Sequence, residues 1–240
     1  RQDPRCSIDL SARVMPTRAL LTEASQRKQR QILPRRTVDG PLRRRFPDHA
    51  FLGEEQSKEQ AKPGQPLWVI DPIDGTTNFL RGIPLFAVSI ACVVDGEPLV
   101  GVIRLPLQDE IFAAARGAGA TLNGGPLAPS KVAKMDESVV AIGSSRKSEA
   151  TAVSASYARL IEAGVEVRRL GSACAATCYV ACGRVDGYLE QQLSPWDVAA
   201  GLVIVEEAGG RANDYASGDW LTTGGPWVCA PPQLFDEVRR

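Results

Sequence analysis

Short apolar runs separated by turn-forming residues fill the sequence from Phe46 onward. In the first half each run has the length of a single strand, and the runs cover residues 50–53, 67–70, 86–94, 99–105 and 110–115. Asp95-Gly96 predicts a hairpin between the third and fourth runs, because this dipeptide readily adopts a two-residue turn. The glycine-rich stretch 117–125 predicts the end of this strand meander.

The second half alternates between strand-like and helix-like segments. Strands are expected at residues 139–143, 165–170 and 185–190, and helices at residues 149–163, at 173–182 and from 195 to the Gly209-Gly210 pair. The last helix has clear ends, since Ser194 is a favoured N-cap, Pro195 suits the first helical position and glycine follows the end. This order predicts α+β or α/β layers rather than a helical bundle or a β-sandwich.

The composition supports a folded globular chain. Of 240 residues, 44% are hydrophobic and 23% are charged, enough for one large domain or two small ones. No apolar run reaches the ~18 residues of a membrane-spanning helix, so we expect no membrane interaction. The 28 basic and 28 acidic residues balance, which gives no overall reason to expect nucleic acid as the main partner. Six cysteines without a signal-peptide core favour a reducing compartment, and we expect the cytoplasm.

The first 45 residues differ from the rest in charge and in pattern. They hold twelve Arg or Lys residues against four Asp or Glu. Residues 20–33 could form a polar helix, but Pro34, Gly40 and Pro41 are expected to break any helix that follows. These basic residues could contact RNA or another acidic partner, although a solvated surface is the simpler interpretation.

This contrast suggests a division of the chain. We expect a divergent basic segment at residues 1–45 and a main domain at residues 46–240, with halves at 46–135 and 136–240. Within the first segment, residues 1–42 are expected to contribute little to the fold.

Histidine and cysteine form no evident site. The thiols of Cys174, Cys178 and Cys182 share one helix face but span about 12 Å along it, too far for one tetrahedral ion. We therefore interpret them as small buried residues. His49 is the single histidine and has no cysteine or serine beside it, so we expect a solvent-facing turn residue rather than a catalytic base.

The densest group of acidic residues follows the apolar run Leu67–Ile70. There the sequence continues Asp71-Pro-Ile-Asp74-Gly-Thr-Thr77. A buried strand delivers Asp71 to its carboxyl end, and the proline restricts the backbone so that Asp74 returns to the same side. The following N–H groups, at a helix N-terminus, suit a phosphate. Carboxylates beside a phosphate favour Mg²⁺, although an Asx-type turn with two surface aspartates stays open.

Two further acidic sites occupy similar positions. Glu54 and Glu55 follow the strand that ends at Gly53, and Asp197 lies in the first turn of the helix that opens at Pro195. By itself, Asp197 would suit the helix dipole and would need no metal.

Taken together, these segments resemble the inositol monophosphatase family, which belongs to the Mg²⁺-dependent, lithium-sensitive phosphatases that include fructose-1,6-bisphosphatase. Residues 68–79 are similar to the family's first signature, W-x-I-D-P-I-D-G-T-x-N-F. Residues 196–210 are similar to its second signature, and Gly53-Glu54-Glu55 matches its G-E-E element. The resemblance covers residues 46–240 and implies a layered α/β/α/β/α sandwich. It departs at Ser25, where an aspartate is expected, so a third metal is not implied.

The resemblance also implies roles for the acidic residues. A first Mg²⁺ would be held by Glu54, Asp71 and the carbonyl of Ile73. A second would be held by Asp71, Asp74 and Asp197. Two such ions hydrolyse a phosphate ester by activating water and stabilising the leaving oxygen, which requires no histidine.

Further residues would bind phosphate, water and substrate. Phosphate would accept hydrogen bonds from the N–H groups of Gly75 and Thr76, and Thr76 with Glu54 would orient and help deprotonate the attacking water. The resemblance implies substrate contacts at Gly171, Ser172, Ala173, Glu190 and Asp197.

The expected function is a Mg²⁺-dependent phosphomonoesterase that acts on a small polyol phosphate, inositol-1-phosphate first, as a homodimer. Other substrates within the same chemistry are histidinol-phosphate, fructose-1,6-bisphosphate and 3′-phosphoadenosine-5′-phosphate. A binding protein that keeps the fold with weak or no activity is the alternative from a different class.

Overall fold

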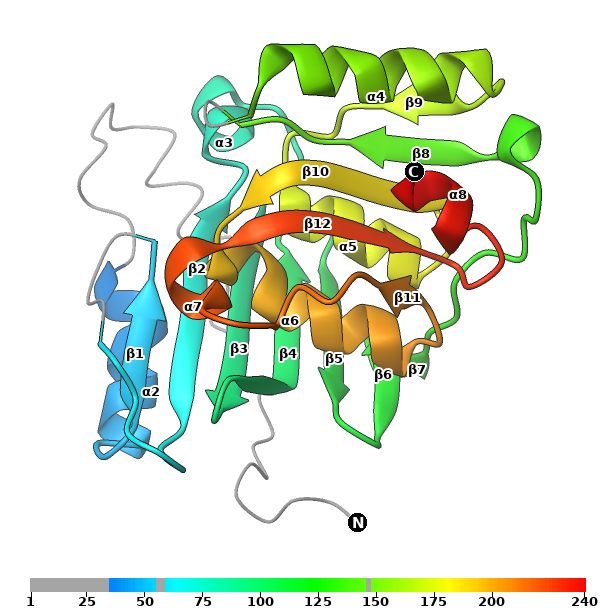
Figure 1. The fold of residues 1–240 in the computed structure, drawn as a ribbon. Helices are drawn as coiled ribbons and strands as arrows, with labels where there is room; N and C mark the ends of the chain where they lie inside the picture. The colour runs from blue at the N-terminus through cyan, green and yellow to red at the C-terminus, as the bar shows by residue number, and fades with distance from the viewer. Residues whose placement is uncertain (1–34, 55–58, 146–147) are drawn as a thin grey trace.

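A computed structural model of the chain describes residues 35–54, 59–145 and 148–240. Its elements form five layers, α/β/α/β/α, as expected (Figure 1). The first sheet has the strand order β1-β2-β3-β4-β5-β6-β7 and the second β11-β12-β10-β8-β9. Within the described residues, no helix combines the length and apolar character needed to cross a membrane.

The first sheet is a meander with one parallel edge. Its strands are β1 (Ala50–Gly53), β2 (Leu67–Asp74), β3 (Ala87–Val94), β4 (Glu97–Leu105), β5 (Glu110–Ala115), β6 (Gly119–Leu122) and β7 (Gly125–Pro126). β1 pairs with β2 in parallel, and every following pair is antiparallel. The predicted hairpin is confirmed, since Asp95 (φ 51°) and Gly96 (φ 81°) both adopt the positive φ of a type I′ turn.

The second sheet lies behind two buried helices. Its strands are β8 (Val139–Ile142), β9 (Glu166–Arg168), β10 (Gly187–Leu193), β11 (Arg211–Ala212) and β12 (Gly225–Ala230). The helices are α2 (Arg35–Arg45), α3 (Thr76–Arg81), α4 (Ala150–Glu162), α5 (Ala173–Ala181), α6 (Pro195–Glu207), α7 (Trp220–Thr223) and α8 (Phe235–Arg239), with a 3₁₀ turn at Met135–Glu137. α5 and α6 fill the middle layer, whereas α4 and α8 cover the outer face of the second sheet (Figure 1).

The middle layer is packed tightly because α6 is apolar on all sides. Residues 198–205 of α6 are buried without interruption, which is typical of a helix enclosed by two sheets. Gly101 on β4 allows the close approach, since a Cβ at this position would lie 2.3 Å from the Ala200 carbonyl oxygen. Small residues of α5 complete the layer. Cys174 and Cys178 are fully buried there, as predicted, whereas Cys182 at the end of the helix is only half-buried.

Most predicted strands and helices are confirmed to within a few residues, but four expectations are wrong. β2 continues through Asp71 to Asp74 instead of ending before Asp71. α2 runs through Gly40 and Pro41, which were expected to break a helix. Because Pro41 is the seventh residue of α2, its missing N–H removes one helical hydrogen bond, and burial of the neighbouring Leu42 (8% exposed) compensates.

Leu42 also overturns the idea that all of residues 1–42 contribute little. It belongs to an outer cluster with Phe51, Trp68 and Ile70, and α2 packs on β2. The helix expected at 20–33 and the Ser25 position lie outside the described residues. The division of the chain at residue 45 stays a prediction.

His49 is the fourth correction, since its half-buried ring packs against aromatic neighbours instead of pointing freely into solvent. It stacks on Phe46 with ring centroids 4.8 Å apart, and its Nδ1 accepts a hydrogen bond of 3.0 Å from the Trp68 indole N–H. Loss of hydration lowers the pKa of His49, although Asp48 opposes this shift. The residue is structural, and it closes the edge of the outer cluster.

Candidate active site

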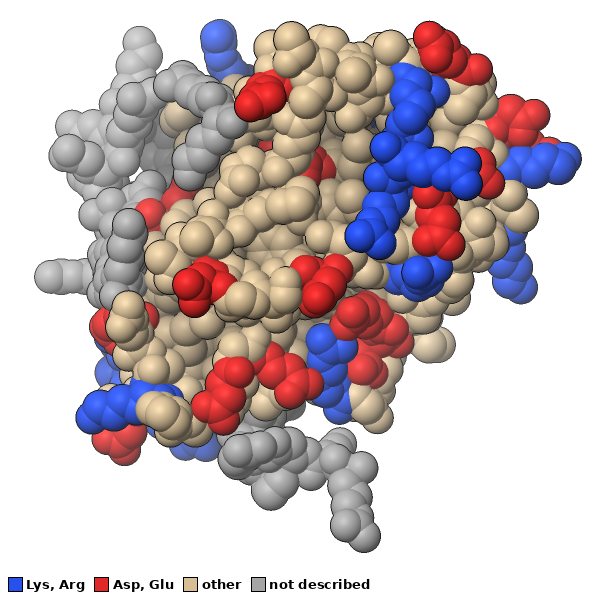
Figure 2. Space-filling model, viewed as in Figure 1, with Lys and Arg blue, Asp and Glu red and all other residues tan. Residues whose placement is uncertain are grey.

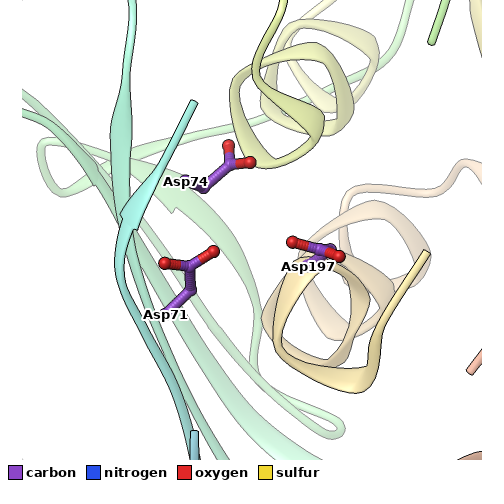
Figure 3. Close-up of side chains that lie close together, drawn as sticks. All are labelled: Asp71, Asp74 and Asp197. Carbon is purple, nitrogen blue, oxygen red and sulfur yellow. The ribbon is translucent and has the colours of Figure 1, made fainter. Parts of the chain in front are cut away.

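Asp71 and Asp74 lie at the carboxyl end of β2 and face the same side. Asp71 pairs with Ser89 of β3 and Asp74 pairs with Ala87, so three steps along β2 match two along β3. This bulge inserts one extra residue and cancels the normal alternation of side chains. Both carboxylates therefore point into the space between the first sheet and the middle helices (Figure 3).

Asp197 approaches this space from the first turn of α6. Its Oδ2 accepts a hydrogen bond of 2.8 Å from the N–H of Ser194, so the two residues form a capping box. Ser89 donates to the carbonyl of Trp196 at 3.2 Å and ties the start of α6 to β3. One carboxylate oxygen each of Asp71, Asp74 and Asp197 lie within 4.8 Å of one another (Figure 3).

The three carboxylates repel one another, and Asp71 and Asp74 are buried whereas Asp197 is half-buried. Burial, followed by the charges of Asp74, Asp197 and Glu54, holds the pKa of Asp71 well above its usual range. Burial and the charge of Asp74 raise the pKa of Asp197 to about 8. Burial also raises the pKa of Asp74, although its hydrogen bonds oppose the shift. An uncompensated acidic group of this kind is what a divalent cation stabilises.

Asp74 also fixes the loop that precedes α5. It accepts hydrogen bonds from the Ser172 hydroxyl, from the N–H of Ala173 (3.2 Å) and from the N–H of Cys174 (3.0 Å). The Ser172 hydroxyl oxygen in turn accepts from Ala175 N–H and caps α5. The structure therefore joins the predicted substrate loop at 171–173 to the predicted metal site through a single carboxylate.

The turn after Asp74 holds the predicted phosphate-binding residues against the same loop. Gly75 has φ 84°, and a Cβ there would lie 3.1 Å from the carbonyl oxygen of Gly171, so glycine is required at this position. Thr76 is exposed and donates from Oγ1 to the Ile73 carbonyl at 3.1 Å. Asn78, which sequence reasoning missed, donates to the carbonyls of Leu85 and Leu170, each at 2.8 Å.

Glu54 is placed near the triad but outside it. Because β1 and β2 are parallel with Gly53 opposite Ile70, the next residue of β1 emerges beside Asp71. Its charge contributes to the raised pKa of both Asp71 and Asp197. The Glu54 side chain is exposed, so it stands at the edge of the candidate site.

Glu190 lines a small cavity next to the triad. The cavity has a volume of about 200 Å³, and its walls include Asp74, Asp197, Gly171, Ser172, Ala173 and Glu190. The lining residues that sequence reasoning missed include Gly143, Arg169 and Tyr188. Tyr188 stands two residues before Glu190 on the same strand, and this alternation is the one signal that could have revealed it.

Comparisons with known proteins identify the family. The model of the inositol monophosphatase family matches residues 7–238, which extends the similarity into the basic N-terminal segment. The Nus factor SuhB of Pasteurella multocida is 40% identical over 200 residues, covering 82% of this chain and 74% of that protein.

Two solved structures share the architecture. The inositol monophosphatase from Anabaena has a TM-score of 0.76 at 38% identity, covering 84% of this chain and 81% of that one. The extragenic suppressor protein SuhB from Bartonella henselae has a TM-score of 0.76 at 34% identity, covering 85% of this chain and 83% of that one. The chain belongs to the inositol monophosphatase family.

Proposed function

We propose that the protein is a Mg²⁺-dependent phosphomonoesterase that hydrolyses a small polyol phosphate, with inositol-1-phosphate as the first candidate. The observation that carries this proposal is the convergence of three carboxylates beside a small cavity that Glu190 lines. Carboxylates supply metal ligands, and the cavity provides room for the alcohol part of the ester. The Anabaena relative carries the name inositol monophosphatase, which agrees with this substrate.

The donor set fits Mg²⁺. Its ligand atoms are hard carboxylate oxygens, and burial with mutual repulsion raises the pKa of Asp71 and of Asp197, which a bound cation would offset. Asp71, Asp74, Asp197, Glu54 and the Ile73 carbonyl would hold the ions. Bound there, two Mg²⁺ ions would lower the pKa of a water molecule and offset the charge on the leaving oxygen.

The chain's own residues bind and orient the reactants in this proposal. The N–H groups of Gly75 and Thr76 bind the phosphate oxygens. The Thr76 hydroxyl and Glu54 orient the attacking water, and its proton passes to the Glu54 carboxylate. The loop at 171–173 borders the substrate, since Asp74 fixes it in place. Glu190 accepts a hydrogen bond from a substrate hydroxyl on the leaving-group side.

Substitution of Asp71 tests the metal site. Asp71→Asn removes one charge from the triad, and we expect phosphate release from inositol-1-phosphate to fall at least about 100-fold, the loss typical of a group that stabilises transition-state charge. Asp136→Asn, at an exposed aspartate outside the site, serves as the matched control. If Asp71→Asn and the parent respond identically to titrated Mg²⁺, the assignment is wrong. The same assay with histidinol-phosphate, fructose-1,6-bisphosphate and 3′-phosphoadenosine-5′-phosphate, and with Li⁺ added, resolves substrate and lithium sensitivity.

A binding role is the second candidate, favoured by the name of the Pasteurella relative, Nus factor SuhB, and by the basic segment at residues 1–45. Figure 2 shows basic side chains gathered near α8, but acidic side chains lie among them, and Arg211 pairs with Asp236. RNA binding that weakens steeply with salt, in a protein that releases no phosphate with Mg²⁺, would favour this role. A homodimer and a cytoplasmic location remain part of the proposal, to be tested by light scattering and by fractionation.

A further inference from the structure

Tyr188 and Glu190 form a buried pair on the wall of the candidate substrate cavity. They stand at alternate positions of β10, so both side chains project from the same face of the strand. The Tyr188 hydroxyl donates a hydrogen bond of 2.6 Å to Glu190 Oε2. Tyr188 is 2% exposed and Glu190 is 9% exposed, so water competes little for this bond.

The neighbouring strand leaves space for this pair. A Cβ at Gly143, just after β8, would lie 1.8 Å from Glu190 Oε2 and 2.8 Å from the Tyr188 hydroxyl oxygen. The obstructed atom is the tip of a flexible side chain, so a larger residue at 143 would displace the carboxylate and leave the strand in place. Glycine at this position therefore preserves the orientation of Glu190.

The pair determines which group Glu190 offers to a ligand. Tyr188 is the hydrogen-bond donor to Glu190 among the described residues, and it engages Oε2. Because Tyr188 engages Oε2, the second oxygen, Oε1, is the acceptor that Glu190 can offer to a ligand in the cavity that it lines. Burial and the charge of Glu190 raise the pKa of Tyr188 well above its usual range, so the phenol stays a donor.

We propose that Tyr188 is a positioning residue, which orients Glu190 for a hydroxyl of the substrate alcohol, and that Gly143 is small for the same purpose. This inference rests on the proposed phosphatase function and narrows its substrate class. The site selects phosphate esters whose alcohol carries a hydroxyl donor near the ester, and it disfavours alcohols that lack one.

Two esters distinguish this role from a structural one. Inositol-1-phosphate offers ring hydroxyls, whereas phenyl phosphate offers none, so only the first can use Glu190. For Tyr188→Phe and Gly143→Ala, we expect affinity and kcat/KM for inositol-1-phosphate to fall about tenfold, the effect of disturbing one charge-assisted hydrogen bond. Both values for phenyl phosphate should stay within about twofold. Tyr157→Phe, which removes the same hydroxyl from an exposed position on α4, is the matched control.

A double-mutant cycle shows whether Tyr188 acts through Glu190. In a Glu190→Ala background, Tyr188→Phe should cause no further loss with inositol-1-phosphate, because the carboxylate it orients is gone. Equal losses for both esters, no loss for either, or an additive loss in the Glu190→Ala background would overturn the assignment.

Binding measured by calorimetry with Ca²⁺ separates this inference from the proposed function. A parent that hydrolyses neither ester, but whose variants lose affinity for inositol-1-phosphate alone, refutes the activity and supports the Tyr188 assignment. A parent that hydrolyses both esters, with variants that show no difference between them, supports the activity and refutes the assignment. A parent that neither binds nor hydrolyses either ester overturns both.

Discussion

Replacing Asp197 with asparagine should stabilise the metal-free protein and remove part of its response to Mg²⁺. Asparagine keeps an oxygen that can accept the Ser194 N–H, so the capping box at the start of α6 survives. What it removes is a charge that partial burial disfavours and that Asp74 repels.

The size of the effect follows from the pKa of Asp197, which is raised from 3.8 to about 8 in the folded protein. Because the folded protein binds this proton more tightly than the unfolded chain, stability is highest below about pH 4 and is lost as the pH rises towards about 8. Between about pH 5 and pH 8 the free energy of unfolding falls by roughly 4 kcal/mol, because each of these three pH units contributes about 1.36 kcal/mol. The raised proton affinity belongs to the coupled aspartates together and not to Asp197 alone. We therefore expect Asp197→Asn to avoid about 2–4 kcal/mol of this loss of stability.

Thermal unfolding in EDTA measures this difference. At about pH 8 the melting temperature of Asp197→Asn should exceed that of the parent by roughly 4–16 °C, and the gap should shrink by more than half at about pH 5. Added Mg²⁺ should raise the melting temperature of the parent by more than that of the variant, since a ligand stabilises only the state that binds it.

The exposed Asp136 provides the control, and Asp136→Asn should follow the parent at every pH. If Asp197→Asn and the parent lose stability in parallel between these pH values without metal, then Asp197 is not a buried, repelled carboxyl and the reasoning fails.

Three further predictions concern the fold. Leu42→Ala should lower the free energy of unfolding by about 2–4 kcal/mol in urea, because Leu42 is buried in the outer cluster, and an unchanged midpoint would show that α2 is dispensable. Gly101→Ala should lower the free energy of unfolding by about 1–3 kcal/mol or more, because the new Cβ would lie 2.3 Å from a main-chain oxygen of α6. The control Gly125→Ala, whose Cβ would have its nearest neighbour at 3.5 Å, should lower it by less than about 0.5 kcal/mol. The pKa of His49 is lowered in the folded protein, so the stability of the parent relative to His49→Gln should be highest above about pH 6.5 and should fall as the pH drops below that value. Parallel stability profiles of the two proteins against pH would contradict the role of neutral His49 as the hydrogen-bond acceptor of Trp68.

The sequence alone predicts the order of the elements and the acidic residues of the site. Strands such as β3 and β4 are readable because apolar run length and the Asp95-Gly96 turn are local signals, which act within a few residues. Asp71 and Asp74 are recognisable because they come directly after the apolar run Leu67–Ile70, although β2 itself continues to Asp74. The family's spacing adds Asp197, whose carboxylate meets theirs in the structure.

Other features depend on packing between segments far apart in the chain. α2 continues through Pro41 because burial of Leu42 against the first sheet outweighs a local preference to break the helix. His49 is held by aromatic neighbours, and one of them, Trp68, lies 19 residues away. In both cases the local sequence indicates the intrinsic preference of the segment, and tertiary packing overrides that preference.

The same limit applies within the site. Asp74 accepts hydrogen bonds from a loop about a hundred residues further on, and Gly143 makes room for a carboxylate on another strand. Neither relation leaves a periodicity or a turn signal in the chain, because each arises only when two layers are brought to a particular distance and register. The sequence therefore determines which groups supply the chemistry, and the tertiary structure decides how Asp74, Glu190 and Tyr188 are oriented, because hydrogen bonds act only at short range and in defined directions.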